Sequence, residues 1–153
     1  MAGNIRQKGG GTVRILVSAC LLGIHCKYSG GDNANAKVLA LAANPANEVI
    51  PVCPEVLGGL PTPRPPAEIQ PDGRVVTQDG HEVTAAYRAG AERTLAIARE
   101  MQPDQIILQS RSPSCGVRER YDGTFSRVRV PGQGVTAALL VKHGFSVEDV
   151  GDI

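Results

Sequence analysis

The chain has 153 residues, a formal net charge of +1 at pH 7, and an aromatic content of only 3%. This length suits one domain that buries a sizeable core. Without a concentrated run of lysine and arginine, and with few rings on which bases stack, the chain is not a dedicated nucleic-acid binder, and we expect no DNA partner. Small ligands, free nucleobases among them, are not excluded.

Residues 1–12 are polar and carry three consecutive glycines, so we expect a flexible leader followed by one domain over residues 13–153. No apolar stretch approaches the roughly 18 residues that span a bilayer, and the leader lacks an apolar export segment. These features predict a cytoplasmic protein without a membrane partner. In that compartment four cysteines indicate metal binding or redox chemistry rather than a disulfide framework.

The first half of the chain predicts two strands and a helix. An apolar run over 13–17 predicts a strand, and a helix should begin near Asp32 or Asn33, either of which can cap it, and end at Asn44-Pro45. A second strand covers 49–52. Residues 54–76 hold six prolines and a Gly-Gly pair, which excludes a long helix and favours an ordered, functional loop.

The second half continues the alternation. A long helix is expected over 84–101, with an apolar stripe of Ala85, Ala89, Leu95, Ala96 and Ala98. A strand over 106–108, a helix over 134–141 and an edge strand over 145–150 follow. Strands that alternate with helices predict a single-domain α/β fold, a three-layer sandwich with a mainly parallel, Rossmann-like sheet.

Three cysteines, Cys20, Cys53 and Cys115, each come after one of the predicted strands. Ligands of open α/β sheets bind at the carboxyl edge, where parallel strands end. Thiolates that are distant in sequence but gathered at such an edge suit a soft transition metal or an iron–sulfur cluster. Three protein ligands would leave one metal position open for chemistry.

The fourth thiol, Cys26, lies beyond the strand end in a turn-rich stretch, and we do not expect it to be a ligand. A structural zinc site is an alternative, but the five residues between Cys20 and Cys26 exceed the usual spacing of two to four. His25, His81 and His143 lack ligand spacing and are expected at the surface.

Polar residues accompany the cysteines. Glu55, two residues after Cys53, is a candidate general acid or base, with a solvated loop carboxylate as the alternative. Arg64 would either orient a planar polar substrate or pair with Glu68. Ser112 and Ser114 either donate hydrogen bonds to thiolate or sulfide, or shape the turn before Cys115.

The chain resembles a bacterial family whose characterised members are 2-thiouracil desulfidases. The resemblance runs from about residue 14 to 150 and rests on the motifs Ser18-Ala19-Cys20-Leu21-Leu22-Gly23, Cys53-Pro54-Glu55, Gly58-Gly59-Leu60-Pro61-Thr62-Pro63-Arg64, Ser112-Pro113-Ser114-Cys115-Gly116, Asp122-Gly123-Thr124-Phe125 and Gly134-Val135-Thr136-Ala137.

The resemblance implies a [4Fe-4S] cluster held by Cys20, Cys53 and Cys115, with an open fourth iron that binds the substrate sulfur. It further implies that Glu55 and Ser112 activate water and move protons. The expected reaction converts a small thiolated pyrimidine such as 2-thiouracil into uracil and hydrogen sulfide, without net electron transfer. Cys26 has no matching role.

Two other classes compete with a desulfidase. A non-catalytic metal-binding or redox-sensing protein would use the same cysteines, but the sequence offers no DNA-binding motif or long amphipathic partner helix. A thiol–disulfide oxidoreductase would carry a Cys-x-x-Cys motif, which is absent. The preferred thiolated substrate and the oligomeric state do not follow from the sequence.

Overall fold

The computed structural model describes residues 12–153, and the predicted leader therefore lies almost wholly outside the described residues. Its centre is a four-stranded sheet in the order β2-β1-β5-β8, all parallel. The strands are β1 (Val13–Ser18), β2 (Asn47–Val52), β5 (Gln105–Leu108) and β8 (Glu148–Asp149). The three strands that precede the candidate ligand cysteines are thus direct neighbours that run in one direction.

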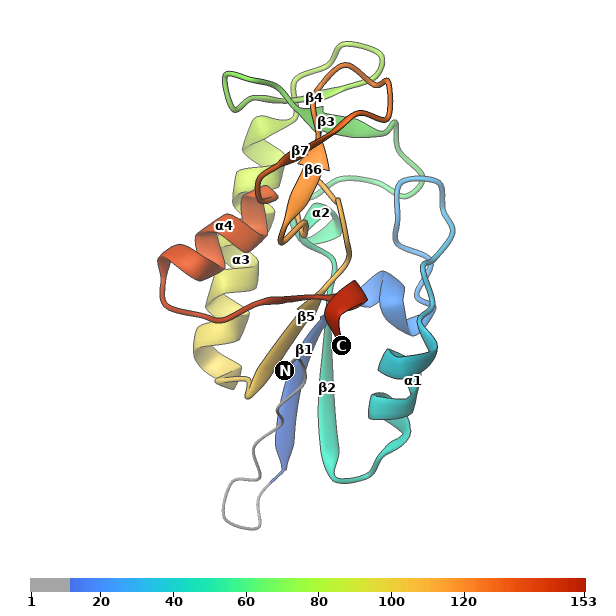
Figure 1. Ribbon diagram of the computed structural model, residues 1–153, viewed down its shortest axis with the longest axis vertical. Helices are drawn as coiled ribbons and strands as arrows, with labels where there is room; N and C mark the ends of the chain where they lie inside the picture. Colours follow the sequence, from blue (N-terminus) through green and yellow to red (C-terminus); the bar gives the residue numbers. More distant parts are fainter. Residues whose placement is uncertain (1–11) are drawn as a thin grey trace.

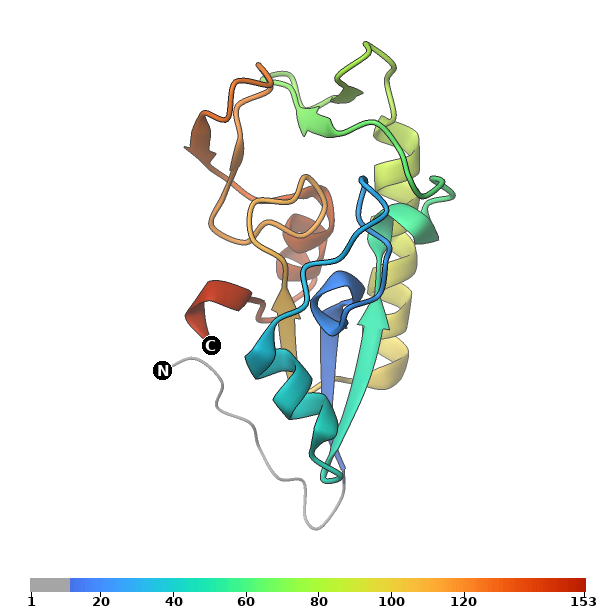
Figure 2. The ribbon, with the colours of Figure 1, turned by 90° about the vertical axis from the view of Figure 1, so that its right-hand side faces the viewer.

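Helices cover both faces of this sheet (Figures 1 and 2). Helix α1 (Ala36–Ala43) lies on one face, and α3 (Thr84–Met101) and α4 (Val135–Lys142) pack together on the other. Strand β1 serves both layers because its side chains alternate: Ile15 packs with Val38 of α1, whereas Leu16 packs with Leu95 and Leu140. The predicted three-layer α/β sandwich is confirmed.

Several element boundaries differ from the prediction. Helix α1 begins later and is capped by Asn35, whose Oδ1 accepts the amides of Lys37 and Val38, while Asp32 accepts the amide of Ala34 before the helix. The expected edge strand shrinks to the two residues of β8, followed by the 3₁₀ turn η2 (Val150–Asp152). The predicted caps were wrong because several neighbouring Asp and Asn residues are equally suited to capping.

Helix α3 has the predicted bounds but a different buried face. Ala85 and Ala96 of the expected stripe are exposed. The buried residues are Thr84, Tyr87, Gly90, Ala91, Thr94, Leu95 and Ala98. The prediction of the buried face was wrong because it counted only aliphatic side chains, whereas glycine, threonine and tyrosine occupy several of the buried positions.

Short elements lie beyond the carboxyl edge of the sheet. The 3₁₀ turn η1 (Ala19–Leu22) follows β1, and α2 (Pro54–Leu57) follows β2. Two antiparallel pairs, β3 (Ala67–Ile69) with β4 (Val75–Thr77) and β6 (Glu119–Tyr121) with β7 (Arg129–Pro131), stand above them (Figure 1). The proline-rich segment was predicted as a loop, and the structure adds a helical turn and a hairpin.

Helix α2 packs closely against α3. A Cβ atom added at Gly58 would lie 2.0 Å from the Ala86 carbonyl oxygen, so only glycine permits this approach.

Among the described residues, no helix combines the length and apolar character needed to cross a bilayer.

Candidate active site at the carboxyl edge of the sheet

A cavity of about 550 Å³ lies between the carboxyl edge of the sheet and the two hairpins. Cys20, Cys53 and Cys115 all line it. Cys20 belongs to η1, Cys53 is the residue before α2, and Cys115 lies in the loop that joins β5 to β6. The strand-edge prediction therefore brought together the three thiols that the structure places at one cavity.

Cys26 also lines this cavity, which strand ends alone did not predict. It lies in the segment after η1, and the Cys53 Sγ is 3.7 Å from its carbonyl oxygen. All four cysteines are free thiols. The histidines, in contrast, are exposed as expected.

The buried thiols are poor acids. Burial raises the pKa of Cys20, although an N–H of the Asn33 side chain, 3.5 Å from its sulfur, acts in the opposite direction. Burial likewise raises the pKa of Cys115 to about 12, and burial together with the nearby Cys53 raises that of Cys26 to about 12. A metal group bound here must therefore displace protons from neutral thiols.

The Glu55 carboxylate is held at both oxygens. Its Oε1 accepts hydrogen bonds from Arg64, with Nη2 at 3.0 Å and Nε at 3.3 Å, and from the Tyr87 hydroxyl at 3.1 Å. Its Oε2 accepts from the Ser114 hydroxyl at 2.6 Å. The side chains of Glu55 and Arg64 are only 13% and 5% exposed. The alternative of a solvated loop carboxylate is therefore wrong.

Arg64 also connects two loops by hydrogen bonds. Its Nη2 donates to the Cys26 carbonyl at 2.8 Å, and its Nη1 donates to Pro61 and Thr62. Of the two roles considered from the sequence, pairing with Glu68 is wrong. The partner is Glu55, at the start of α2.

Glu68 instead holds the loop between β6 and β7. Its Oε1 accepts the amides of Gly123 and Phe125 at 2.9 and 3.1 Å. Phe125 and Arg127 of this loop both have left-handed backbone conformations and both line the cavity. We call residues 122–127 the roof loop.

Ser112 and Ser114 form the turn before Cys115. The Ser112 Oγ accepts the amides of Ser114 and Cys115 at 3.1 and 3.0 Å, and lies 2.9 Å from the Ser114 Oγ. Ser112 lines the cavity, whereas Ser114 is fully buried. The turn-shaping role considered for Ser112 is confirmed.

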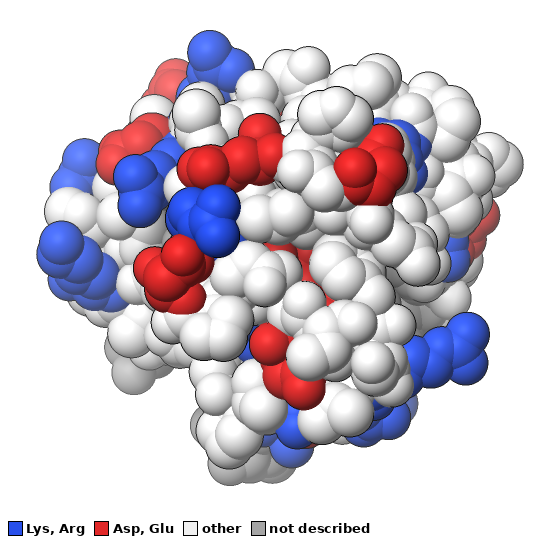
Figure 3. All heavy atoms as spheres, turned by 90° about the horizontal axis from the view of Figure 1, so that it is seen from above, with Lys and Arg blue, Asp and Glu red and all other residues white. Residues whose placement is uncertain are grey.

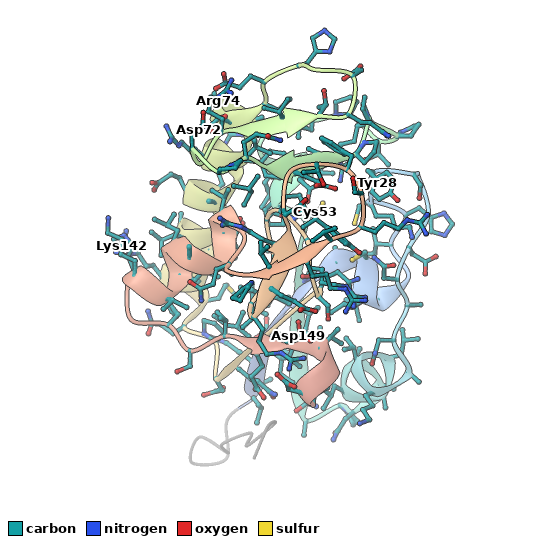
Figure 4. All side chains as sticks on the ribbon, turned by 45° about the horizontal axis from the view of Figure 1, so that its top comes forward. Tyr28, Cys53, Asp72, Arg74, Lys142 and Asp149 are labelled. Atoms are coloured by element: carbon teal, nitrogen blue, oxygen red, sulfur yellow. The ribbon has the colours of Figure 1, made fainter. Side chains whose placement is uncertain are left out.

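The cavity also has aromatic and basic side chains in its lining. These are Tyr28, Tyr121, Phe125, Lys27, Arg111 and Arg127. Figure 4 shows Tyr28 and Cys53 close together near the two hairpins, while Lys142 and the Asp72–Arg74 pair lie at the outside. Seen from the hairpin end, charges of both signs are interspersed around a hollow with acidic atoms inside it (Figure 3).

Sequence reasoning missed three contributors to this site. Asn33 was considered only as a helix cap, yet its side chain bonds to the Cys20 sulfur. Tyr87 had no distinguishing neighbours in the sequence, and its role follows from the packing of α2 on α3. The roof loop was noticed only as a motif, without a position.

The donor chemistry discriminates between metal groups. Within residues 12–153, no three His, Cys, Asp or Glu side chains are gathered closely enough to hold a single metal ion. The three thiols instead stand around one cavity with small hydrogen-bond donors beside them, an arrangement that suits a larger iron–sulfur group better than one zinc ion.

Comparison with known proteins identifies the family. The 2-thiouracil desulfurase family model matches residues 15–150. The chain belongs to the 2-thiouracil desulfurase family.

Two relatives of this desulfurase-family chain cover almost its whole length. It is 44% identical over 142 residues to the uncharacterized protein YbbK of Bacillus subtilis (strain 168), which spans 87% of this chain and 93% of that protein. The solved structure of TudS, a [4Fe-4S]-dependent thiouracil desulfidase, superposes with a TM-score of 0.85 at 41% identity, covering 93% of each chain.

Proposed function

We propose that this chain is a [4Fe-4S]-dependent desulfidase that converts a small thiolated pyrimidine such as 2-thiouracil into uracil and hydrogen sulfide. The observation that carries the proposal is the meeting of Cys20, Cys53 and Cys115 at one cavity that also contains Glu55. The family match and the 41% identity to TudS support it. In this proposal residues 13–153 act as one catalytic domain.

The residues present fit the cluster. Cys20, Cys53 and Cys115 would hold it, since thiolates are the usual ligands of iron–sulfur groups, and the Ser18 hydroxyl beside Cys115 and the Asn33 amide beside Cys20 support anionic sulfur. When bound with three protein ligands, such a cluster supplies an open iron that acts as a Lewis acid toward the sulfur of the substrate. Cys26 is not needed in this set.

Glu55 and Ser112 are the proposed proton-handling residues. In the overall reaction a water oxygen replaces the sulfur on carbon, and the two water hydrogens leave with the sulfur as hydrogen sulfide. A group beside the cavity must therefore take a proton from water and return one to the departing sulfur. Both side chains line the cavity, and Glu55 is held in place by Arg64.

The aromatic side chains of the cavity lining, Tyr28 and Phe125 among them, suit a planar pyrimidine. We further propose that the enzyme works in the cytoplasm. Free thiols and an oxygen-sensitive open iron both require a reducing compartment, and all four cysteines here are free.

Purification without oxygen tests this function. We expect brown protein with about four iron and about four acid-labile sulfide per chain, and turnover of 2-thiouracil followed by loss of its absorbance and by release of hydrogen sulfide. One zinc per chain and no iron after anaerobic reconstitution would contradict the cofactor. Iron-replete protein inactive on every thiolated pyrimidine would contradict the reaction and favour a sensor.

A further inference from the structure

We propose that Ser114 is a positioning residue that joins Ser112 and Glu55 in one directed hydrogen-bond chain and so fixes both side chains relative to each other at the cavity. The inference rests on the proposed function, in which Ser112 and Glu55 handle protons. Ser114 is fully buried and does not line the cavity, so it acts through its two neighbours and not on the substrate.

The direction of the chain follows from the contacts of Glu55. Its Oε1 is occupied by the Arg64 guanidinium and the Tyr87 hydroxyl. The other carboxylate oxygen, Oε2, accepts the hydrogen of the Ser114 hydroxyl at 2.6 Å, a length typical of a hydroxyl bound to a carboxylate.

That assignment determines the next bond. A serine hydroxyl has one hydrogen, and that of Ser114 is committed to Glu55. In the 2.9 Å contact between the two serines, Ser112 is consequently the donor and Ser114 the acceptor. No direct hydrogen bond joins Ser112 to Glu55 in the described part of the chain, so Ser114 is their connection.

The backbone holds Ser112 at the start of this chain. Its Oγ accepts the amides of Ser114 and Cys115 at 3.1 and 3.0 Å. Loss of the Ser114 hydroxyl would leave Ser112 held by these two amides but no longer connected to Glu55.

A competing role for Ser114 is support of a cluster ligand, because its Oγ also lies 3.7 Å from the Cys115 sulfur. The carboxylate contact is much the shorter of the two, so the hydroxyl hydrogen belongs to Glu55. The two roles differ in their consequences. Loss of ligand support lowers the iron content, whereas loss of the chain lowers turnover per cluster.

The test compares Ser114→Ala with Ser114→Thr, which keeps the hydroxyl, and with Thr94→Val, which removes a buried hydroxyl bonded only to the Gly90 carbonyl within α3. We expect Ser114→Ala to retain iron and KM while kcat falls by about 10²-fold. Ser114→Thr should recover most of kcat, and Thr94→Val should match wild type.

Combination with Glu55→Gln tests the chain itself. Ser114→Ala should lower kcat no further in a Glu55→Gln background, and the two losses of Tm should be non-additive, because both changes remove the same contact. Additive losses, an unchanged kcat in Ser114→Ala, or a loss confined to iron content would each overturn the proposal. The Tm cycle needs no turnover, so it judges Ser114 even if the wild type fails on thiolated pyrimidines, a result that would contradict only the proposed function.

Discussion

Gly90 of α3 lies directly against Pro54, the first residue of α2, such that a Cβ atom added to Gly90 would come within 1.8 Å of the Pro54 carbonyl oxygen. Pro54 stands between Cys53 and Glu55. This backbone contact therefore sets the position of a proposed cluster ligand and a proposed catalytic carboxylate at once.

We expect Gly90→Ala to lower both Tm and the iron content. In an exposed helix interior the same change would stabilise by about 1 kcal/mol, so a loss here reports the clash with α2. Thermal unfolding and iron analysis measure the two effects. Ala96→Ser on the exposed side of the same helix is the control and should keep full iron. A more stable Gly90→Ala protein with full iron would show that α2 is free to move.

Serine substitutions separate the proposed ligands from the bystander thiol. Cys20→Ser, Cys53→Ser and Cys115→Ser should each abolish stable cluster binding, because two thiolates do not hold the cube. Cys26→Ser should keep cluster and activity, since Arg64 binds the backbone carbonyl of Cys26, which the substitution leaves in place. Iron analysis of each variant, purified without oxygen, shows which cysteines are ligands. If Cys26→Ser lost the cluster and one of the other variants kept it, the ligand assignment would be wrong.

Removal of the proton-handling groups should affect turnover and not the cofactor. Glu55→Gln and Ser112→Ala are expected to retain the cluster absorbance while turnover of 2-thiouracil falls by about 10²-fold or more, as for other positioned acids and bases. Rates are compared at equal iron content. Wild-type rates in both variants would mean that other groups move the protons.

The buried ion pair should matter more than an exposed one. Arg64→Met removes the guanidinium partner of the nearly buried Glu55 carboxylate, and we expect the free energy of unfolding to fall by about 3 kcal/mol. Arg74→Met breaks a pair with Asp72 in which both side chains are more than half exposed, and should cost less than about 1 kcal/mol. Denaturant unfolding of both proteins provides the comparison. Equal losses would argue against a special environment for Glu55.

The iron-free, reduced protein should lose stability in alkali. In the unfolded chain the Cys115 thiol has its ordinary pKa of 9.0, while burial raises the folded pKa to about 12. Between these values the unfolded state has released the proton and the folded state has not, so rising pH favours unfolding. The stabilisation is complete below pH 9.0 and is lost toward pH 12.

Thermal unfolding at neutral pH and at about pH 10 measures this effect. Cys115→Ala should show a flatter dependence than wild type over the same range. Identical slopes would mean that the buried thiol does not contribute.

The central sheet and the three thiols were predictable because both depend on local signals. Continuous apolar runs such as 13–17 and 106–108 indicate buried strands, and parallel strands necessarily deliver their following residues to one edge. The long helix α3 was equally clear from its length and from the proline after it. The local sequence pattern was sufficient to predict a feature wherever that feature depended on a single strand or helix.

The hydrogen bonds around Glu55 were not predictable from the same patterns. Arg64, Tyr87 and Ser114 reach this carboxylate from a loop, a helix and a turn that are widely separated in the sequence. These side chains meet at Glu55 because α2 packs closely against α3. Glycine permits this close approach, but its presence in the sequence does not predict it. The choice of Glu55 over Glu68 as the partner of Arg64 likewise depends on tertiary packing.

The roof loop owes its position to a side chain from another hairpin. Glu68 of β3 binds the amides of Gly123 and Phe125, while the Gln70 side chain donates to the Gly123 carbonyl. The position of the roof loop over the cavity therefore depends on two residues of the β3–β4 segment, of which Glu68 itself lines the cavity. For the redesign of substrate range, this places the adjustable part of the enzyme in the β3–β4 hairpin and leaves the thiol-bearing floor untouched.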